Sequence, residues 1–521
     1  MKTSLAEKEA SAATSAGGLR GAAARGASFA AVTTIAVQIL TLGTYVVLAR
    51  LAPPSVFGEF AAGSILLGLG QMFTETGMPA ALLQRRDNLD VAAVTALAST
   101  FIGGVLLALL ALASSPIIGL YFRSHEVALV AAALSGQLII NGITGVPGTL
   151  LQRRLALRRW AVDPVAAVMF GVVSGVCLAS GFGVWGLVIG WYASAATRTL
   201  WLWIGVGWLP DPRLISFNMW RQLARFGRHI LASEILREVQ NVATTAIMGR
   251  YLGTTDLGKF RFGWQLVSSA TTPVLAANAS TIQPVYVRIS QDRAQIRRVV
   301  LASLRVVSFL AFPIGAVFIP LGAAFSVILF GEAWRGTGSI MMILSGMAIA
   351  LPMASVSSEI FKVSGHPDIL PRMHGLWTTL SIVLMLALVS TGANGVASAW
   401  SVSTISLALY ALTRLPRVVP VGLREIARAI SPPLLSATIV GFSLLVFNSY
   451  ILHFHPADDL HTVAVTICEI LGGLVTYFSG VALLARESLN EIRLTLRAMV
   501  RRRSTGDDAQ AAQLLTPVSR N

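Results

Sequence analysis

Apolar residues run along this chain in stretches of about 20 residues, the length that a transmembrane α-helix needs to cross the hydrocarbon core of a bilayer. These stretches recur from one end of the sequence to the other and predict an all-α polytopic membrane protein with about fourteen transmembrane helices. The predicted spans are residues 27–49, 61–83, 91–114, 127–150, 161–181, 184–206, 229–249, 264–287, 299–320, 338–360, 375–391, 395–413, 431–450 and 462–484.

Polar and small residues indicate that the first half of the chain is repeated 200 residues later. RLAPPSVFGEF at 50–60 and RYLGTTDLGKF at 250–260 share an arginine, a glycine and a phenylalanine at matching positions. The first and seventh spans also carry equivalent polar stripes at the spacing of one helical face. The stripes are Thr34, Gln38, Thr41 and Tyr45 in one, and Glu234, Glu238, Asn241 and Thr245 in the other. We therefore expect two six-helix bundles that are parallel repeats, followed by an appended helix pair.

The spans and the segments between them predict the domain organisation. The parts are a disordered cytoplasmic tail at 1–26, an N-terminal six-helix bundle at 27–206, a cytoplasmic linker at 207–228, a C-terminal six-helix bundle at 229–413, a second cytoplasmic linker at 414–430, helices 13 and 14 at 431–484, and a basic cytoplasmic tail at 485–521.

The charge distribution orients the predicted helices. The chain is 55% hydrophobic and only 12% charged, yet its net charge is +16. Of the 40 Lys and Arg, 31 lie in the two tails and in every second loop, and three lie inside spans. The opposite loops hold the other six, which are Arg50, Arg123, Arg250, Lys259, Arg261 and Arg335. Basic loops stay in the cytoplasm, so both termini are predicted to be cytoplasmic. Because topology accounts for the positive charge, we expect no nucleic-acid partner.

One segment comes close to a phosphate-binding motif. GTTDLGK at 253–259 approaches a P-loop, but the motif needs Ser or Thr after the lysine, where this chain has Phe260, and it must follow a β-strand. The predicted topology also places it outside the cell, where ATP is absent. We interpret it as a duplicated connection between two helices and expect neither ATP nor any other cofactor to bind. We also expect no metal site and no catalytic constellation, so the chain is not predicted to be an enzyme.

Polar and ionisable side chains inside the spans are the candidate site residues, because a charge at mid-bilayer costs about 2.5–3.5 kcal/mol unless it meets a partner or a watery cavity. They are Gln38, Glu75, Arg198, Glu234, Arg237, Glu238, Asn241 and Arg305. The cluster on the predicted seventh helix, Glu234, Arg237 and Glu238 with Asn241 on the same face, could instead form a structural ion pair between helices. Arg305 could extend to lipid headgroups, and Glu75 could lie in the turn that ends a helix. We expect the two facing bundles to enclose a polar, net cationic cavity suited to an anionic substrate.

Four segments carry a resemblance to a known family. They are LARLAPPSVFGEF (48–60), TETGMPAALLQRRD (74–87), IMGRYLGTTDLGKFRFGWQL (247–266) and FPIGAVFIPLGAAFSVILFGEAW (312–334). They resemble the polysaccharide transporter (Wzx-like) branch of the multidrug/oligosaccharidyl-lipid/polysaccharide (MOP) flippase superfamily. The resemblance extends over about residues 20–485.

The resemblance implies two bundles that give alternating access to a central cavity. It also implies export of an undecaprenyl-pyrophosphate-linked repeat unit across the bacterial inner membrane. Cationic cavity residues would hold the pyrophosphate or acidic sugars, and Arg198, Arg237 and Arg305 match by position in the fold. Members often carry an Asp in helix 7 where this chain has Thr244, so Glu238 or Glu234 would have to replace it in an ion site.

The expected function is therefore a flippase of lipid-linked oligosaccharides for exopolysaccharide, capsule or O-antigen synthesis. Its partners would be the lipid-linked glycan and the bilayer, with a polysaccharide polymerase and co-polymerase as further candidates. Two alternatives stay open. A multidrug or cation antiporter of the same superfamily would be expected to use a carboxylate in helix 1, where this chain has Thr34, Gln38 and Thr41. A membrane polymerase or ligase would carry a large outer loop with catalytic charges.

Overall fold

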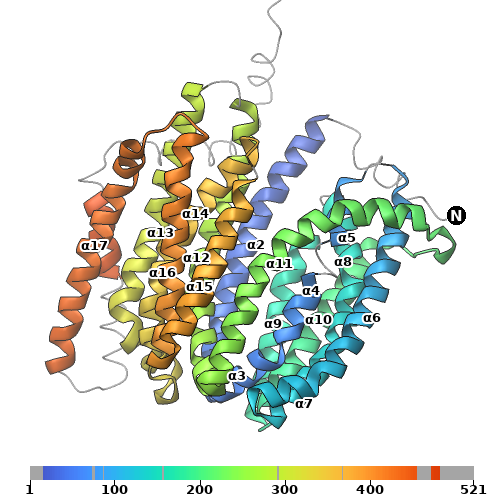
Figure 1. The fold of residues 1–521 in the computed structure, drawn as a ribbon, viewed down its shortest axis with the longest axis horizontal. Helices are drawn as coiled ribbons and strands as arrows, with labels where there is room; N and C mark the ends of the chain where they lie inside the picture. The colour runs from blue at the N-terminus through green and yellow to red at the C-terminus, as the bar shows by residue number, and fades with distance from the viewer. Residues whose placement is uncertain are drawn as a thin grey trace, which may run out of the picture.

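The fold is entirely helical in the part of the chain that the structure describes (Figure 1). The computed structural model describes residues 16–72, 77–85, 87–154, 158–289, 293–366, 368–454 and 471–481. Within these ranges no strand occurs, in agreement with the all-α class predicted from the apolar stretches.

The first group of helices contains two interrupted segments. Its members are α2 (Ala16–Leu51), α3 (Pro54–Gly63), α4 (Ile65–Gln71), α5 (Met78–Gln84), α6 (Leu89–Phe122), α7 (His125–Ser135), α8 (Gln137–Arg153), α9 (Arg158–Ala179) and α10 (Val184–Val206). The second predicted span is divided among α3, α4 and α5, and the fourth is divided between α7 and α8 at Gly136. The Ser124 side chain caps α7 by accepting a hydrogen bond from the Val127 N–H at 3.3 Å.

The second group follows a short 3₁₀ turn, η2 (Pro212–Leu214). Its members are α11 (Phe217–Tyr251), α12 (Gly253–Ile289), α13 (Arg293–Phe330), α14 (Thr337–Val363), α15 (Ile369–Leu388), α16 (Ala393–Arg414) and α17 (Leu423–Phe454). A further helix at 471–481 packs on this group, where the Tyr477 hydroxyl donates to the Phe309 carbonyl oxygen at 3.1 Å. α2 begins before the first residue of the predicted span 27–49, and α11 begins inside the predicted linker 207–228.

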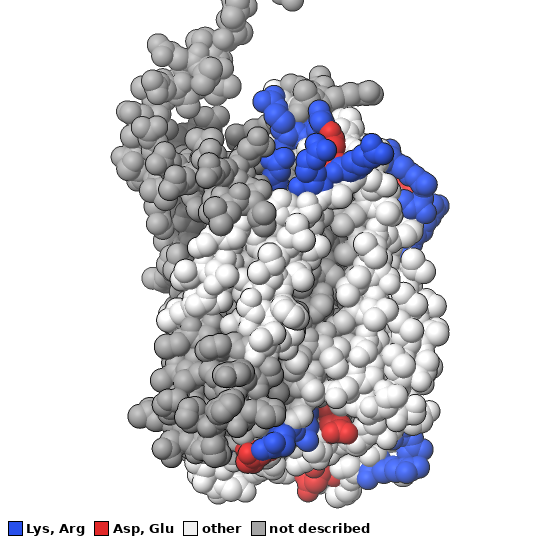
Figure 2. All heavy atoms as spheres, turned by 90° about the vertical axis from the view of Figure 1, so that its left-hand side faces the viewer, with Lys and Arg blue, Asp and Glu red and all other residues white. Residues whose placement is uncertain are grey.

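The lengths and apolar character of the helices fit a membrane. Nine segments among the described residues are long and apolar enough to cross one. The remaining predicted spans fall on α3–α5, α10, α11, α12 and the helix at 471–481, whose described residues do not meet the same length and hydropathy together. On the face drawn in Figure 2, charged side chains gather at the two ends and leave a belt without Lys, Arg, Asp or Glu between them, apart from residues drawn in grey. The chain is a polytopic membrane protein.

The two ends of the molecule differ in charge. One end, called here the basic end, carries Arg85, Arg153, Arg154, Arg213, Arg221, Arg225, Arg297 and Arg298, and η2 and the start of α11 lie there. The opposite end carries acidic and basic residues in similar numbers, including Arg50, Glu59, Arg123, Glu126, Arg250, Asp256, Glu332 and Arg335. The loops that the sequence predicts to be basic therefore lie together at one end of the helices.

The two groups of helices are joined tightly near the opposite end, where α3 packs along α12. An aromatic cluster from both groups fills this junction. Phe57 of α3 meets Trp334 and Phe262 edge-on, with ring centroids 5.2 and 5.7 Å away, and Phe262 meets Phe330 at 4.7 Å. Trp334 is fully buried, and its indole N–H donates to the Ala49 carbonyl at 2.9 Å.

A pair of arginines from the sequence repeat also joins the two groups at this end. Arg50, near the end of α2, donates from Nε to the Leu329 carbonyl at 2.8 Å and from Nη2 to the Ile328 carbonyl. Arg250, at the equivalent place on α11, donates to the Tyr121 carbonyl at 3.2 Å. Leu329 and Tyr121 each precede the last residue of a helix, α13 or α6. Each arginine thus satisfies a free carbonyl at the end of a helix in the other group.

Candidate functional site

Three adjoining pockets lie among the helices of the first group and at its contact with the second group. The first, called here the interface pocket, lies between the two groups and has a volume of about 270 Å³. The second, the N-terminal pocket, has about 350 Å³, and the third, the basic-end pocket, has about 370 Å³. The first two share Tyr45, Gln71, Trp191 and Gln265, and the last two share Thr144 and Arg198. The three pockets adjoin one another in a row that begins beside the aromatic junction and ends near the basic end.

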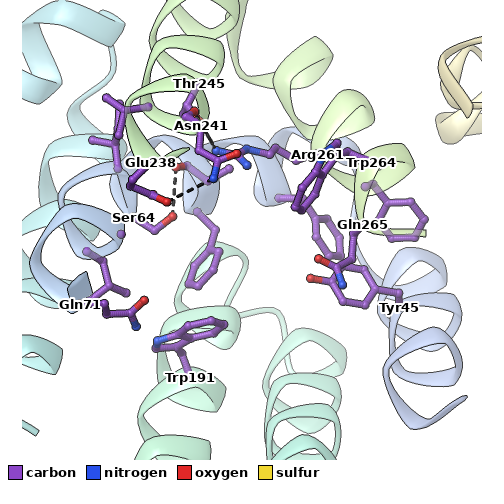
Figure 3. Close-up of a pocket in the computed structure, with 18 residues that line it drawn as sticks. Tyr45, Ser64, Gln71, Trp191, Glu238, Asn241, Thr245, Arg261, Trp264 and Gln265 are labelled. Carbon is purple, nitrogen blue, oxygen red and sulfur yellow. Dashed lines mark hydrogen bonds between the residues drawn. The ribbon is translucent and has the colours of Figure 1, made fainter. Parts of the chain in front are cut away.

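The interface pocket is built around a guanidinium and a carboxylate from neighbouring helices (Figure 3). Arg261 of α12 donates to the Thr245 hydroxyl and, at 3.4 Å, to the Asn241 carbonyl, both on α11. The Asn241 side-chain amide donates in turn to Glu238 Oε2 at 3.2 Å. Arg261 Nε is buried and has no hydrogen-bond partner among the residues that the structure describes. The pocket therefore holds one positive and one negative group side by side.

The N-terminal pocket is lined mainly by neutral polar and aromatic side chains. Gln137 and Asn141 of α8 are 2% and 6% exposed, and the Gln137 amide donates to Asn141 Oδ1 at 3.1 Å. Gln137 Oε1 and Asn141 Nδ2 have no hydrogen-bond partner in the described part of the chain. Trp191, Phe170 and Tyr45 provide aromatic surface. Amide groups beside aromatic rings suit a sugar, which offers hydroxyl groups at its edge and C–H groups on its face.

An ion-paired cluster lies between the N-terminal and basic-end pockets. Asp163 of α9 accepts from Arg198 Nη2 of α10 at 2.6 Å and from Arg159 Nη1, one turn earlier on α9, at 3.3 Å. Arg198 lines both of these pockets and, with Asp163 and Gln38, a smaller fourth pocket beside α2. The cluster carries two positive charges and one negative charge.

The structure places half of the predicted site residues on these pockets. Gln38 and Arg198 lie on the N-terminal side, and Glu238 and Asn241 line the interface pocket. Arg305 of α13 lines none of the four pockets. The remaining three are Glu234 and Arg237, which lie on α11 with side chains outside the described part, and Glu75, which is outside the described residues altogether. Their assignment to the cavity stays a prediction.

Two site residues were missed by sequence reasoning. Arg261 was counted among the loop residues before the predicted span 264–287, and this was wrong, because α12 begins at Gly253 and carries Arg261 into the interface pocket. Asp163 was not singled out, although it lies in the predicted span 161–181. Its ionisable side chain near the start of an apolar stretch was the available signal. Its pairing with Arg198, 35 residues away, follows only from the packing of α9 on α10.

The place where the family resemblance led us to consider an ion site holds a neutral network. Thr244 is 1% exposed, accepts from the Trp400 indole N–H at 3.0 Å and donates to the Gln240 carbonyl at 2.7 Å. The Gln240 amide donates to Ser381 at 2.9 Å, and the Ser381 hydroxyl donates to Ser403 at 2.6 Å. These helices are held together there by neutral hydrogen bonds.

The near P-loop forms no strand–loop–helix unit. The segment 253–259 is the first part of α12, which follows α11 after the single residue Leu252. Gly253 has a φ of +85°, a conformation that glycine adopts without strain, and it makes the turn between the two helices. The interpretation as a connection between helices is confirmed for the turn itself, and the remainder of the segment is helical.

A family model described as "Polysaccharide biosynthesis protein" matches residues 47–338. The chain is 22% identical over 439 residues to the "Teichuronic acid biosynthesis protein TuaB" of Bacillus subtilis, and the aligned region covers 80% of this chain and 87% of that one. It is 24% identical to the "Succinoglycan biosynthesis transport protein ExoT" of Rhizobium meliloti, over 58% of this chain and 61% of that one.

Solved structures have the same fold. "Lipid II flippase MurJ, inward closed conformation" superposes with a TM-score of 0.69 at 14% identity, covering 88% of this chain and 99% of that one. A multidrug resistance transporter of the MATE family, in an inward-facing conformation, superposes with a TM-score of 0.59 at 18% identity, over 74% of this chain and 98% of that one. It is described as a member of the MOP superfamily.

Proposed function

Because the chain belongs to the family of polysaccharide biosynthesis proteins and has the fold of MOP-superfamily transporters, we propose that it is a flippase for lipid-linked oligosaccharides. It moves undecaprenyl-pyrophosphate-linked repeat units across the bacterial inner membrane for exopolysaccharide, capsule or O-antigen synthesis. It acts by alternating access, without catalysis and without ATP. Polysaccharide polymerase and co-polymerase act on the repeat unit after it.

The observation that carries this proposal is the composition of the adjoining pockets. Charged groups lie at both ends, Arg261 with Glu238 and Arg198 with Asp163, and amides and aromatic rings lie between them. A lipid-linked sugar has the matching composition, an anionic pyrophosphate joined to a chain of hydroxyl-rich rings. A ligand that places its pyrophosphate on an arginine would bring its sugars against Gln137, Asn141 and Trp191.

The arrangement of the helices suggests the direction of movement. Because basic loops favour the cytoplasm, the proposed orientation has the basic end and both termini inside the cell. In that orientation the aromatic junction closes the path toward the outside, and the basic-end pocket leads toward the cytoplasm. The headgroup enters from the cytoplasmic side while the polyprenyl tail stays in lipid. Separation of α3 from α12, with closure at the basic end, then releases the glycan outside.

The experiment that tests the proposal is a deletion of the gene in the producing bacterium. We expect loss of extracellular polysaccharide and accumulation of single lipid-linked repeats on the cytoplasmic leaflet, measured by mass spectrometry of extracted lipids. Unchanged polysaccharide together with new sensitivity to cationic drugs would place the protein among the antiporters. Completed repeats that reach the outer leaflet without being polymerised would point to a polymerase or ligase.

A further inference from the structure

The cluster of Asp163, Arg159 and Arg198 has the form of an anion site that is occupied by a carboxylate of the protein itself. Each carboxylate oxygen of Asp163 accepts a hydrogen bond from a different guanidinium group. Oδ1 accepts from Arg198 at 2.6 Å and Oδ2 accepts from Arg159 at 3.3 Å. A phosphate or carboxylate group of a ligand would present oxygens to the same two donors. Arginine is well suited to this exchange because its planar donors match either group.

The cluster is open to the cavity rather than sealed between helices. The side chains of Arg198, Asp163 and Arg159 are 43%, 30% and 26% exposed. All three line pockets, and Arg198 lies where the N-terminal and basic-end pockets meet. A ligand in either pocket can therefore approach the guanidinium groups without displacing a helix.

The groups that face the cluster from other helices favour an anion over a cation. Gln38 and Thr34 of α2, Gln152 and Thr144 of α8, and Ser194 of α10 line the same pockets, and none of them is charged. Asp163 is the sole carboxylate lining these three pockets in the described part of the chain. Among the described side chains of this cluster, two guanidinium groups and one carboxylate sum to a net positive charge.

We infer that Asp163 is a stand-in for the anionic group of the substrate: it neutralises Arg198 and Arg159 while the cavity is empty, and phosphate or carboxylate oxygens displace it on loading. The inference rests on the proposed function, since it names how the same cavity receives its substrate. Exchange of one anion for another means that the guanidinium groups are never left without a counter-charge in a cavity of low dielectric constant. Competition from Asp163 also weakens binding, which allows release on the other side.

Carboxyl labelling of the unmodified protein tests the exchange directly. The protein in lipid nanodiscs is treated with a water-soluble carbodiimide and an amine, and labelling of each carboxylate is quantified by mass spectrometry. Inorganic pyrophosphate is added in one arm, and undecaprenyl pyrophosphate is incorporated in the other. Labelling of Asp163 should rise when either anion binds, because the carboxylate is freed from its arginines. Labelling of Glu332, which pairs with Arg335 outside the cavity, should not change.

The two arms separate the possible sources of the anion. A rise with inorganic pyrophosphate supports a site that accepts a free anion, and a rise with undecaprenyl pyrophosphate alone supports a site for the lipid headgroup. Unchanged or reduced labelling of Asp163 in both arms overturns the inference. The deletion strain tests the proposed function separately, because its readout is export of the lipid-linked glycan and does not depend on the carboxyl labelling of Asp163.

Substitution of Asp163 tests the exchange through the affinity for pyrophosphate, because loss of this carboxylate should tighten binding rather than weaken it. Asp163→Asn removes the competing charge and should tighten pyrophosphate binding by about tenfold, whereas Arg198→Gln should weaken it by a similar factor. Glu332→Gln, which removes an exposed ion pair outside the cavity, is the matched control and should leave binding unchanged. An ion pair with only a structural role predicts weaker binding in Asp163→Asn, and that result in a folded variant would refute the exchange.

Discussion

Gly58 on α3 and Gly258 on α12 lie against each other where the two helices cross, and each is the counterpart of the other in the 200-residue repeat. A Cβ added to either glycine would lie 3.0 Å from the backbone nitrogen of the other. The same Cβ on Gly58 would overlap the Thr254 carbonyl oxygen, and on Gly258 it would overlap the Pro54 carbonyl oxygen. Pro54 and Thr254 are themselves counterparts, so the contact is symmetric. The repeat places two glycines where the bundles need their closest backbone approach.

Gly58→Ala should open the end of the molecule that this crossing closes. A methyl group cannot fit against the Thr254 carbonyl, so α3 must move away from α12. Spin labels are placed at the positions of Glu126 and Glu332, exposed residues at that end in different helix groups. The distance between the two labels, measured by double electron–electron resonance, should be longer in the variant. Gly103→Ala is the control, because a Cβ there meets nothing within 4 Å. An unchanged distance distribution in Gly58→Ala would show that the crossing does not hold this end closed.

Removal of the two helix-capping arginines should favour the same opening. Arg50→Gln and Arg250→Gln each remove a donor to a terminal carbonyl of the other group, at Leu329 and Tyr121. Each contact is exposed, so each substitution should cost on the order of 0.5–1 kcal/mol and shift the populations by a few fold. The double variant should exceed either single one in the same distance measurement.

Arg123→Gln provides the matched control for that pair. Arg123 is exposed at the same end, and no side-chain hydrogen bond from it appears among the described residues. If Arg123→Gln opens the protein as much as Arg50→Gln does, general loss of charge would explain the effect and the capping contacts would not.

The sequence predicted the membrane class, most helices and the repeat, because each rests on a pattern along one helix. It also predicted that Arg198, Glu238 and Gln38 are unusual, since ionisable and amide groups stand out in apolar spans. It could not pair Arg198 with Asp163 or place Arg261 beside Asn241, because these contacts join different helices and depend on rotation and depth. Arg261 was misplaced because a hydropathy pattern locates the apolar part of α12 and not the beginning of the helix.

Thr244→Val should destabilise the protein without altering the charge of the cavity. The substitution preserves the shape of the side chain but leaves the buried Trp400 indole N–H without its acceptor. An orphaned buried donor costs about 1–3 kcal/mol, so the midpoint of thermal unfolding should fall. Thr244→Ser keeps the hydroxyl group and should lose much less stability. Equal midpoints for the Val and Ser variants would mean that the hydrogen bond to Trp400 contributes little.

Arg261→Gln should abolish polysaccharide export while the protein is still produced. Its guanidinium lies beside Glu238 and Asn241 in the interface pocket, and its loss removes the positive charge that lines this pocket with the carboxylate. Arg261→Lys should retain part of the activity, because it keeps the charge but not the planar donors. Export is measured as extracellular polymer in a complemented deletion strain. Normal export by Arg261→Gln, at matched expression, would remove this residue from the substrate path.

Lys259→Ala should leave export within about twofold of the wild type, well below the tenfold that a lost charged contact to substrate would cost. The lysine completes the near P-loop, but it lies on the first turns of α12 at the end opposite the basic loops, and it lines none of the four pockets. Arg261, only two residues later, does line the interface pocket. Comparing substitutions of these two neighbouring cations therefore distinguishes a phosphate-loop role, which would need Lys259, from a cavity role, which would need Arg261. A variant at Lys259 as inactive as Arg261→Gln, with normal expression and unfolding temperature, would restore the phosphate-loop interpretation.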